Sequence, residues 1–97
     1  MEILGRNIKT RLGELDLVAR DGEVLVFVEV KSRRGYAFAP PEISVTAAKQ
    51  RKLVALAQAY LQELPEPLPP CRFDVLAVLL PDGGPPRIRH IRDAFTA

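Results

Sequence analysis

Apolar and polar residues alternate along this chain in short runs that turn residues separate, a pattern that predicts five β-strands. The second and third runs are rich in Leu, Val and Phe, and the pair Asp21-Gly22 between them is a strong signal for a two-residue hairpin turn. The first run has a weaker pattern. The expected strands are residues 2–9, 13–20, 23–32, 72–80 and 86–91.

One long helix is expected between the third and fourth strands, over residues 46–63. Thr46 or Ser44 can cap its first turn, and the proline-rich segment 65–70 ends it. Apolar side chains recur in the helix at the three- and four-residue spacing of a buried stripe. The members of this stripe are Leu53, Ala57, Tyr60, Leu61 and Leu64.

These elements give the order β-β-β-α-β-β and an α/β (α+β) fold class. The strand–helix–strand connection has the length of a right-handed crossover, which implies parallel pairing of the third and fourth strands. A mixed β-sheet with one long helix packed on it follows. The apolar run of residues 72–80 is typical of a central strand that is buried on both sides, and residues 33–43, with their Gly and Pro, are expected to form a loop.

Acidic residues interrupt the apolar pattern of the hairpin. Glu14 and Asp16 alternate in the second strand, so they share a face of the sheet. Glu29 and Lys31 do the same in the third strand. With the expected turn, Glu14 faces Glu29 and Asp16 lies diagonal to Glu29. The opposite face would hold Leu15, Leu17, Val28 and Val30.

Like charges that face each other destabilise a sheet, so this arrangement favours a bound cation. Carboxylate oxygens with a main-chain carbonyl and waters suit Mg²⁺ or Mn²⁺. A neighbouring Lys31 can position a water nucleophile or offset charge in a transition state. The alternative is a solvated strand face with alternating Glu and Lys. Val18 and Phe27 lie on the same face, which favours the functional interpretation because the face is not wholly polar.

Lys49 lies four residues before Leu53, in line with the buried stripe of the helix. It also lies in the first helical turn, where a cation opposes the helix dipole. A lysine at this position can point along the sheet towards the acidic face, and the alternative is a lysine that extends to solvent at a helix end. Arg51 and Lys52 are interpreted as solvated residues or as phosphate contacts.

Length and composition fit one domain, residues 1–97, with a single core. The net charge of +2 is small, but basic residues cluster at 31–34, 49–52 and 87–92. A single cysteine excludes an intrachain disulfide and a cysteine zinc site. No run reaches transmembrane length and the N-terminus lacks a signal-peptide pattern, so we expect a cytoplasmic protein that does not contact a membrane.

Three further residues are assigned structural roles. Cys71 is expected to be a small apolar packing residue. Asp74, inside an apolar strand, is expected to pair with a nearby basic residue or a backbone donor. His90 has no acid or cysteine at ligand spacing, so it is interpreted as an ordinary strand or surface histidine.

The motif Glu14-x-Asp16, followed after twelve residues by Glu29-Val30-Lys31, resembles the PD-(D/E)XK motif of restriction-endonuclease-like nucleases. Further segments make the chain similar to the YraN-like bacterial family, which is largely uncharacterised and is assigned to the endonuclease-like fold by its motifs. The resemblance extends over residues 3–91. The segments that carry it are 13–18, 27–33, 49–51 and 72–75.

The resemblance implies a restriction-endonuclease-like fold and assigns roles within this chain. The implied catalytic residues are Asp16, Glu29, Lys31 and Glu14. The implied ligands of Mg²⁺ or Mn²⁺ are Asp16, Glu29 and the Val30 carbonyl. Glu14 matches an acid that supports the site or binds a second metal, and Lys49 matches a helix lysine of the family that lies next to the site.

Members of the family usually begin with a helix ahead of the segment that corresponds to residues 3–7, and this chain starts with Met1 just before that segment. The resemblance therefore implies that the usual N-terminal helix is absent and that part of one sheet face is uncovered. Exposed sheet surface favours strand exchange or a homodimer.

The leading hypothesis is a magnesium-dependent endonuclease that hydrolyses phosphodiester bonds in DNA rather than RNA, with branched or repair intermediates as candidate substrates by analogy within the fold. The expected phosphate contacts are Arg33, Arg34, Lys49 and Lys52. Two alternatives stay open. One is a nucleic-acid-binding module of nuclease fold without catalysis, and the other is a protein-interaction scaffold whose acidic face meets a basic partner.

Overall fold

A computed structural model of the chain describes residues 1–35 and 45–96 and contains a mixed α+β fold. The order β-β-β-α-β-β is confirmed. The elements are β1 (Glu2–Thr10), β2 (Gly13–Asp21), β3 (Val24–Arg34), α2 (Ala47–Leu61), β4 (Cys71–Leu80) and β5 (Arg87–Phe95). The predicted loop 33–43 is strand as far as Arg34, and from residue 36 it lies outside the described residues.

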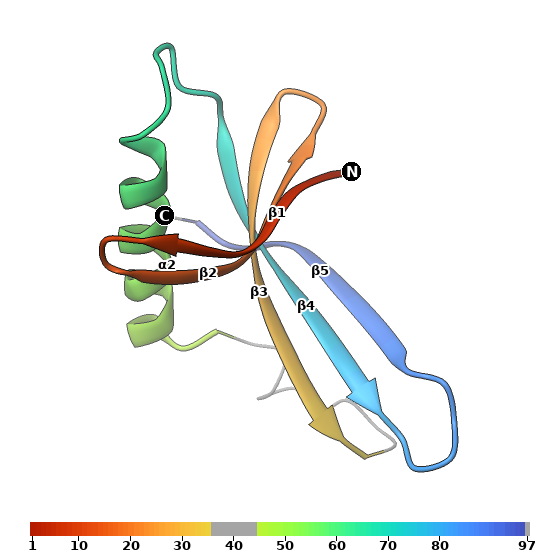
Figure 1. The fold of residues 1–97 in the computed structure, drawn as a ribbon. Helices are drawn as coiled ribbons and strands as arrows, with labels where there is room; N and C mark the ends of the chain where they lie inside the picture. The colour runs from red at the N-terminus through yellow and green to blue at the C-terminus, as the bar shows by residue number, and fades with distance from the viewer. Residues whose placement is uncertain (36–44, 97) are drawn as a thin grey trace.

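The five strands form one sheet in the order β1-β2-β3-β4-β5 (Figure 1). Neighbouring strands are antiparallel except β3 and β4, which are parallel as the crossover predicts. The middle strand is β3, and β4 lies between β3 and β5, so residues 72–80 form an interior strand as their apolar run predicts. Cys71, at the start of β4, is exposed and is not the packing residue that we expected.

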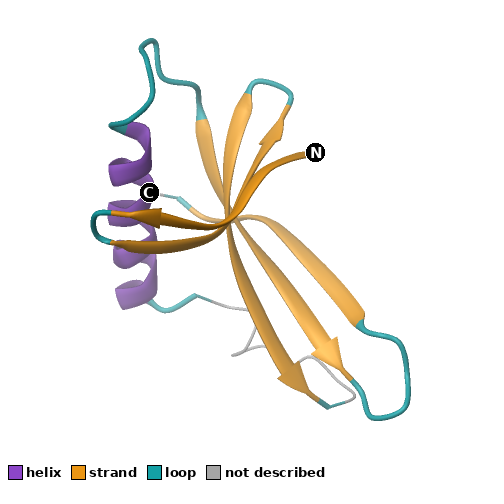
Figure 2. Cartoon of the chain, in the orientation of Figure 1, coloured by secondary structure: helices purple, strands orange, loops and turns teal. Residues whose placement is uncertain are grey.

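Helix α2 begins after Thr46, whose side chain accepts a hydrogen bond from the Lys49 N–H, so the predicted cap is confirmed at this residue. Ser44, the other candidate, lies outside the described residues. The helix ends at Leu61, before the proline-rich segment, and packs along one side of the sheet (Figure 2). Its buried residues include two members of the predicted stripe and two that the pattern missed. They are Leu53, Ala57, Leu56 and Ala59.

The two faces of the sheet have separate apolar clusters. On the α2 side, the largest buried side chain is Phe27, whose ring stacks on Phe73 and meets Tyr60 edge to face. On the other side, a smaller cluster surrounds Val26 and Val28. In the described part of the chain no helix covers this second face. Exposed apolar residues on this face include Ile3, Val30, Leu80 and Ile88.

Strands β3, β4 and β5 continue together beyond the end of the β2–β3 pairing and form a projecting arm (Figure 1). The β2–β3 pairing stops at Leu17 and Val28, whereas the β3–β4 pairing continues to Arg34 and Leu80. We define the arm as residues 29–34, 75–80 and 87–91. From residue 29 onwards, the edge of β3 that faces β2 is no longer paired with it. We call the point where this pairing ends the opening between β2 and β3.

The predicted register of the hairpin is wrong by two residues. Asp21 pairs with Val24, so the turn consists of Gly22 and Glu23 rather than Asp21 and Gly22. Gly22 has φ +61°, and a type II′ turn places glycine at its first position for this reason. Because the error is an even number of residues, it does not move side chains from one face to the other.

The regular alternation in β2 also breaks near Asp16. Leu15 belongs to the cluster on the α2 side together with Val18, whereas Leu17 packs against the cluster on the opposite side. The expectation that Leu15 and Leu17 share a face is therefore wrong. Asp16 lies between them, at the residue where β2 turns away from β3.

Candidate functional site

Asp16 lies at the opening between β2 and β3. Its Oδ2 accepts a hydrogen bond of 2.9 Å from the Val30 N–H, at the edge of β3 that β2 has just left. The N–H and C=O of one strand residue point to the same neighbour, so the Val30 carbonyl lies on this same edge. The structure thus brings together Asp16 and Val30, as the sequence motif predicts.

Glu29 and Lys49 form the second contact of the site. The Lys49 Nζ lies 3.4 Å from Glu29 Oε1, which confirms that the helix lysine points towards the acidic strand. The Glu29 side chain is only 15% exposed, whereas that of Lys49 is 57% exposed. The first turn of α2 therefore delivers a cation to a half-buried carboxylate at the base of the arm.

Some of the other predicted basic residues share a face of β3 with Glu29. Lys31 and Arg33 follow Glu29 at period two, so both lie on the same face of β3. Arg34 lies on the opposite face, so the predicted set of phosphate contacts is not on one surface. Lys52 is exposed on α2, one turn after Lys49.

Glu14 is not part of this arrangement. It pairs with Lys9 on β1, and the β2–β3 ladder ends before reaching it. The expectation that Glu14 faces Glu29 is wrong, because the residues of β2 before Leu17 are not paired with β3 and the register differs by two residues. Glu14 lies two residues before Asp16 on β2, and a role for it in the site stays a prediction.

A groove of about 480 Å³ adjoins Asp16 on the sheet face opposite α2. Its walls are mainly apolar, and β1 contributes two polar residues, Arg6 and Asn7, that sequence reasoning missed. Asn7 has φ +50°, an uncommon conformation for a residue other than glycine, and it marks an irregularity in β1. In the sequence, the weak strand pattern of residues 2–9 was the only sign that β1 is irregular here. The lining residues are Ile3, Arg6, Asn7, Asp16, Leu17, Val30 and Leu76.

The oxygen atoms at the opening are of the type that Mg²⁺ prefers as ligands. They are two carboxylates and one main-chain carbonyl, which are hard oxygen ligands. Within residues 1–35 and 45–96, no three His, Cys, Asp or Glu side chains lie close enough together to hold a metal by themselves. Mg²⁺ commonly uses one or two carboxylates and completes its coordination with waters and substrate oxygens, so a pair of acids is sufficient.

A second acidic centre lies on β4. Asp74 is 1% exposed and accepts hydrogen bonds from Arg72 Nε at 3.1 Å and from the Asp93 N–H at 2.9 Å. His90 Nε2 lies 2.7 Å from Asp74 Oδ2. The predicted pairing of Asp74 is confirmed. His90 lies on strand β5, as expected, but sequence spacing missed its acidic partner, which lies on the neighbouring strand β4. Arg72 also bonds Asp21 at 2.8 Å, so one guanidinium joins two carboxylates.

The electrostatics of this centre follow from its contacts. Burial favours the neutral acid and on its own would raise the pKa of Asp74, but hydrogen bonds from Arg72, the Asp93 N–H and His90 outweigh it and the pKa is lowered. The hydrogen bond from Arg72 likewise lowers the pKa of Asp21. Asp74 thus remains a carboxylate in the core, with its charge matched by Arg72.

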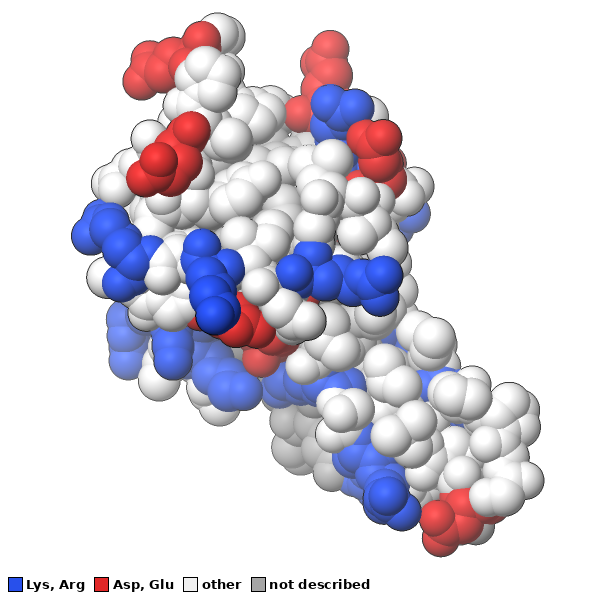
Figure 3. Space-filling model, in the orientation of Figure 1, with Lys and Arg blue, Asp and Glu red and all other residues white. Residues whose placement is uncertain are grey.

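Charge is unevenly distributed over the surface. Figure 3 shows basic side chains in a band across the middle of the molecule, with a small acidic area enclosed by it. The band extends onto the arm, whereas other acidic side chains lie at the upper end of the molecule and near the tip of the arm. This distribution suits contact with an anionic partner around the middle of the molecule.

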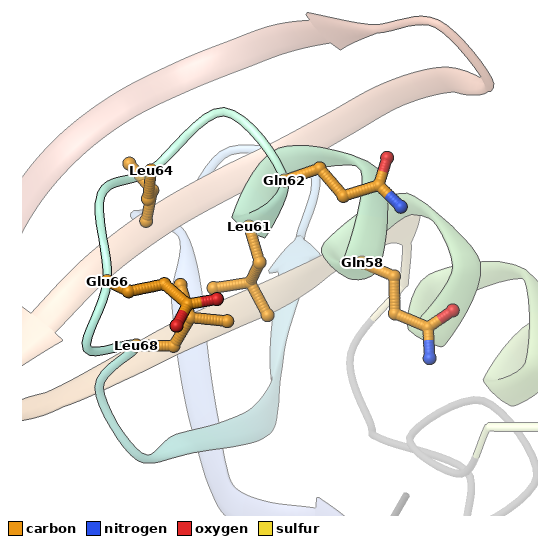
Figure 4. A pocket seen from close by; sticks show the side chains of 6 residues that line it. All are labelled: Gln58, Leu61, Gln62, Leu64, Glu66 and Leu68. Carbon is orange, nitrogen blue, oxygen red and sulfur yellow. The ribbon is translucent and has the colours of Figure 1, made fainter.

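Another hollow, of about 410 Å³, lies between the end of α2 and the segment that follows it (Figure 4). Its lining contains leucines, two glutamine amides and a single carboxylate, that of Glu66. None of the predicted site residues lies in it. This hollow therefore has no group of side chains with an evident chemical role.

The family model described as "Uncharacterised protein family UPF0102" matches residues 1–78. A UPF0102 protein of Symbiobacterium thermophilum is 54% identical over 95 residues, which cover 98% of this chain and 80% of the relative. One of Rhodococcus opacus is 47% identical with the same coverage. One of Geotalea daltonii is 47% identical over 93 residues, 96% of this chain and 73% of its own. The chain therefore belongs to the UPF0102 family, as the resemblance to YraN-like proteins implies.

The family description and the names of these relatives state no activity. Among the described residues, no helix is both long and apolar enough to cross a membrane.

Proposed function

We propose that this chain is a metal-dependent nuclease that hydrolyses phosphodiester bonds in DNA. The observation that carries the proposal is the opening between β2 and β3, where Asp16 accepts a hydrogen bond from the Val30 N–H and Glu29 is the residue just before Val30 on β3. The Asp16 carboxylate thus meets the Val30 main chain at the opening, and the Glu29 carboxylate extends from the adjacent residue on the α2 side, beside Lys49. This proposal places the protein in the cytoplasm, where cellular DNA is present.

Asp16 and Glu29, with the Val30 carbonyl, are the residues that would hold Mg²⁺ or Mn²⁺. When bound, the ion would polarise a phosphate oxygen and lower the pKa of a coordinated water. The hydrogen bond from the Val30 N–H fixes one oxygen of Asp16 and leaves the other available as a ligand. β2 and β3 therefore hold the two acids in place before a ligand arrives, which reduces the cost of ordering them.

Lys31 is proposed to position the attacking water or to offset the charge that develops on the phosphate. It lies on the same face of β3 as Glu29, two residues further along. Lys49 lies beside Glu29, where it orients that carboxylate and attracts a phosphate group. The glutamate thus lies between two lysines, one on its own strand and one on α2.

The test combines metal binding with cleavage. Mn²⁺ is titrated into the wild type and Asp16→Asn by calorimetry, and a panel of labelled duplex, nicked, single-stranded and branched DNA is incubated with both proteins and with Lys31→Ala. We expect Asp16→Asn to lose metal binding and both variants to lose cleavage by at least about 100-fold, the upper range for groups that only support a metal ligand.

Asp82→Asn, a change of the same kind in the exposed β4–β5 turn, serves as the control and should behave as the wild type. Retained cleavage in purified, folded Asp16→Asn and Lys31→Ala would refute the assignment of the site.

A second candidate function is a nucleic-acid-binding module of the same fold without catalysis. The observation that favours it is the band of basic side chains across the middle of the molecule, which can attract a polyanion without any metal (Figure 3). It predicts DNA binding with a steep salt dependence and no cleavage with any metal. If the wild type binds neither metal nor DNA, both functions are excluded, and the acidic strand face becomes a surface for a protein partner.

A further inference from the structure

One face of the arm is basic, and three strands contribute to it. Side chains in one row across a sheet point to the same face. The β3–β4 and β4–β5 pairings run without a register shift through this part of the arm, so the rows can be assigned. The two rows are Lys31–Ala77–Arg89 and Arg33–Leu79–Arg87.

This basic face continues from the candidate catalytic site. Glu29, in the row before Lys31, contacts Lys49 of α2, so the face lies on the α2 side of the sheet. In the described strands of the arm, Glu29 is the only acidic residue on this face. Arg87 and Arg89 are exposed on β5, at the edge of the sheet, while Ala77 and Leu79 between the basic residues are buried.

The other face of the same strands is different in character. It carries Val30, which is 38% exposed, and Ile88, which is 64% exposed, with Leu76 and Val78 between them. Because both faces belong to the same strands, the basic residues cannot be explained as a general property of an exposed arm. Of the five lysines and arginines of the arm, four lie on the side that holds Glu29, and only Arg34 lies on the other side.

We propose that this basic face binds the phosphate backbone of the nucleic acid that leads away from the site, and that Arg87 and Arg89 are phosphate-binding residues. The rows are about 7 Å apart and the outer strands about 10 Å apart, so the four cations cover a small plane. Arg33 lies four residues beyond Glu29, or about 13 Å. At one phosphate per about 3.4 Å of each strand, this corresponds to about four nucleotides.

The arm contact rests on the proposed function, and the experiment separates the two. Binding of a fluorescein-labelled 24-base-pair DNA duplex is followed by anisotropy with EDTA present, so that no metal-dependent cleavage occurs. The test protein is Arg87→Gln with Arg89→Gln. The matched control is Arg11→Gln with Arg20→Gln, two exposed arginines outside the arm whose replacement removes the same charge.

We expect the arm variant to bind at least about tenfold more weakly than the wild type at 0.1 M salt, and the slope of log K against log salt to fall by about 2. The control pair should lose much less affinity, and Arg87→Lys with Arg89→Lys should restore most of the binding because it retains both charges. Thermal unfolding of each variant checks that the edge strand β5 is intact.

Equal affinities of the folded arm variant and the control pair would overturn the arm contact while leaving the proposed function in place. If the wild type itself fails to bind the duplex, the proposed function fails together with the arm contact. A weakened Arg→Gln pair that the Arg→Lys pair does not rescue would also count against phosphate binding, since it would indicate a structural role for the guanidinium groups.

Discussion

Two aspartates of this sheet differ in nearly everything except their chemistry. Asp74 is buried at the start of the arm, and its carboxylate is bonded by Arg72, His90 and the Asp93 N–H. Asp16 lies at an opening of the sheet beside a groove, and the bond that is resolved for it comes from the Val30 N–H. A carboxylate whose hydrogen-bonding capacity is used inside the protein serves stability, and one that keeps capacity at an opening can serve a ligand.

The Asp74 centre also explains an irregularity of the backbone. The β4–β5 pairing shifts between Phe73 and Val75, and Asp93, on the shifted part of β5, has φ +51°. Asp74 accepts the N–H of this residue and thereby fixes the bulge. Asp16, at the opening between β2 and β3, supports the backbone through its bond from the Val30 N–H. The contrast therefore predicts opposite results for the same substitution.

The largest effect is expected from truncation of Asp74. Asp74→Ala should lower the free energy of unfolding by about 3 kcal/mol, since the Arg72 guanidinium and the Asp93 N–H both lose the carboxylate that accepts their hydrogen bonds. Asp16→Ala should lower it by about 1 kcal/mol or less, the value of one hydrogen bond. Urea unfolding of both variants measures the difference. A loss at Asp16 as large as that at Asp74 would make Asp16 a structural residue.

Acid should reveal the same contrast with a smaller effect. The pKa of Asp74 is lowered in the folded protein, with burial opposing the shift and the bonds from Arg72, Asp93 and His90 outweighing it. The carboxylate therefore contributes stability above its unfolded pKa of about 3.9, and this is lost as the pH falls through the lower folded value. The midpoint of urea unfolding is measured between pH 6 and pH 2.

The acid-dependent loss of stability should be smaller in Asp74→Asn than in the wild type. It should persist in Asp16→Asn, which serves as the matched variant of the same chemistry. The pKa of Asp21 is also lowered by its bond from Arg72, so a residual slope is expected in Asp74→Asn. An unchanged slope in Asp74→Asn would show that Asp74 does not control the response to acid.

Much of this fold could be predicted from local pattern. Element order, the parallel β3–β4 pair and the Thr46 cap follow from periodicity, connection length and a capping residue, all of which act over a few positions. The hairpin register could not, because it depends on the conformation of Gly22 and on the point at which β2 bends away. The extension of β5 to Phe95 was missed for a similar reason, since a bulge interrupts its pattern.

The candidate site was predictable where it depends on one strand and unpredictable where strands must come together. Spacing alone places Glu29 and Lys31 on one face, and the helix stripe directs Lys49 to it. The distance of Glu14 from Glu29, the partnership of His90 with Asp74 and the rows of the arm all depend on register between distant segments. A single sequence contains no direct signal for such pairing.

The smallest effect is expected at the pair between Glu29 and Lys49. Lys49 is 57% exposed and its Nζ lies 3.4 Å from Glu29, so solvent screens the attraction. Lys49→Met should change the free energy of unfolding by no more than about 0.5 kcal/mol. Urea unfolding of Lys49→Met, Glu29→Gln and the double variant measures the coupling between the two side chains. Lys52→Met, one helical turn away, is the control for removal of a charge from α2.

The direction in which the Mn²⁺ affinity of Lys49→Met changes gives a second test of the pair between Glu29 and Lys49. An ammonium group beside Glu29 opposes a second cation at that carboxylate, so Lys49→Met should bind Mn²⁺ more tightly than the wild type, whereas Lys52→Met should bind it almost unchanged. Calorimetry measures both affinities. A coupling above about 1 kcal/mol together with unaltered Mn²⁺ binding would place Glu29 with Asp74 among the structural acids, and Asp16 alone would then remain as the carboxylate of the opening.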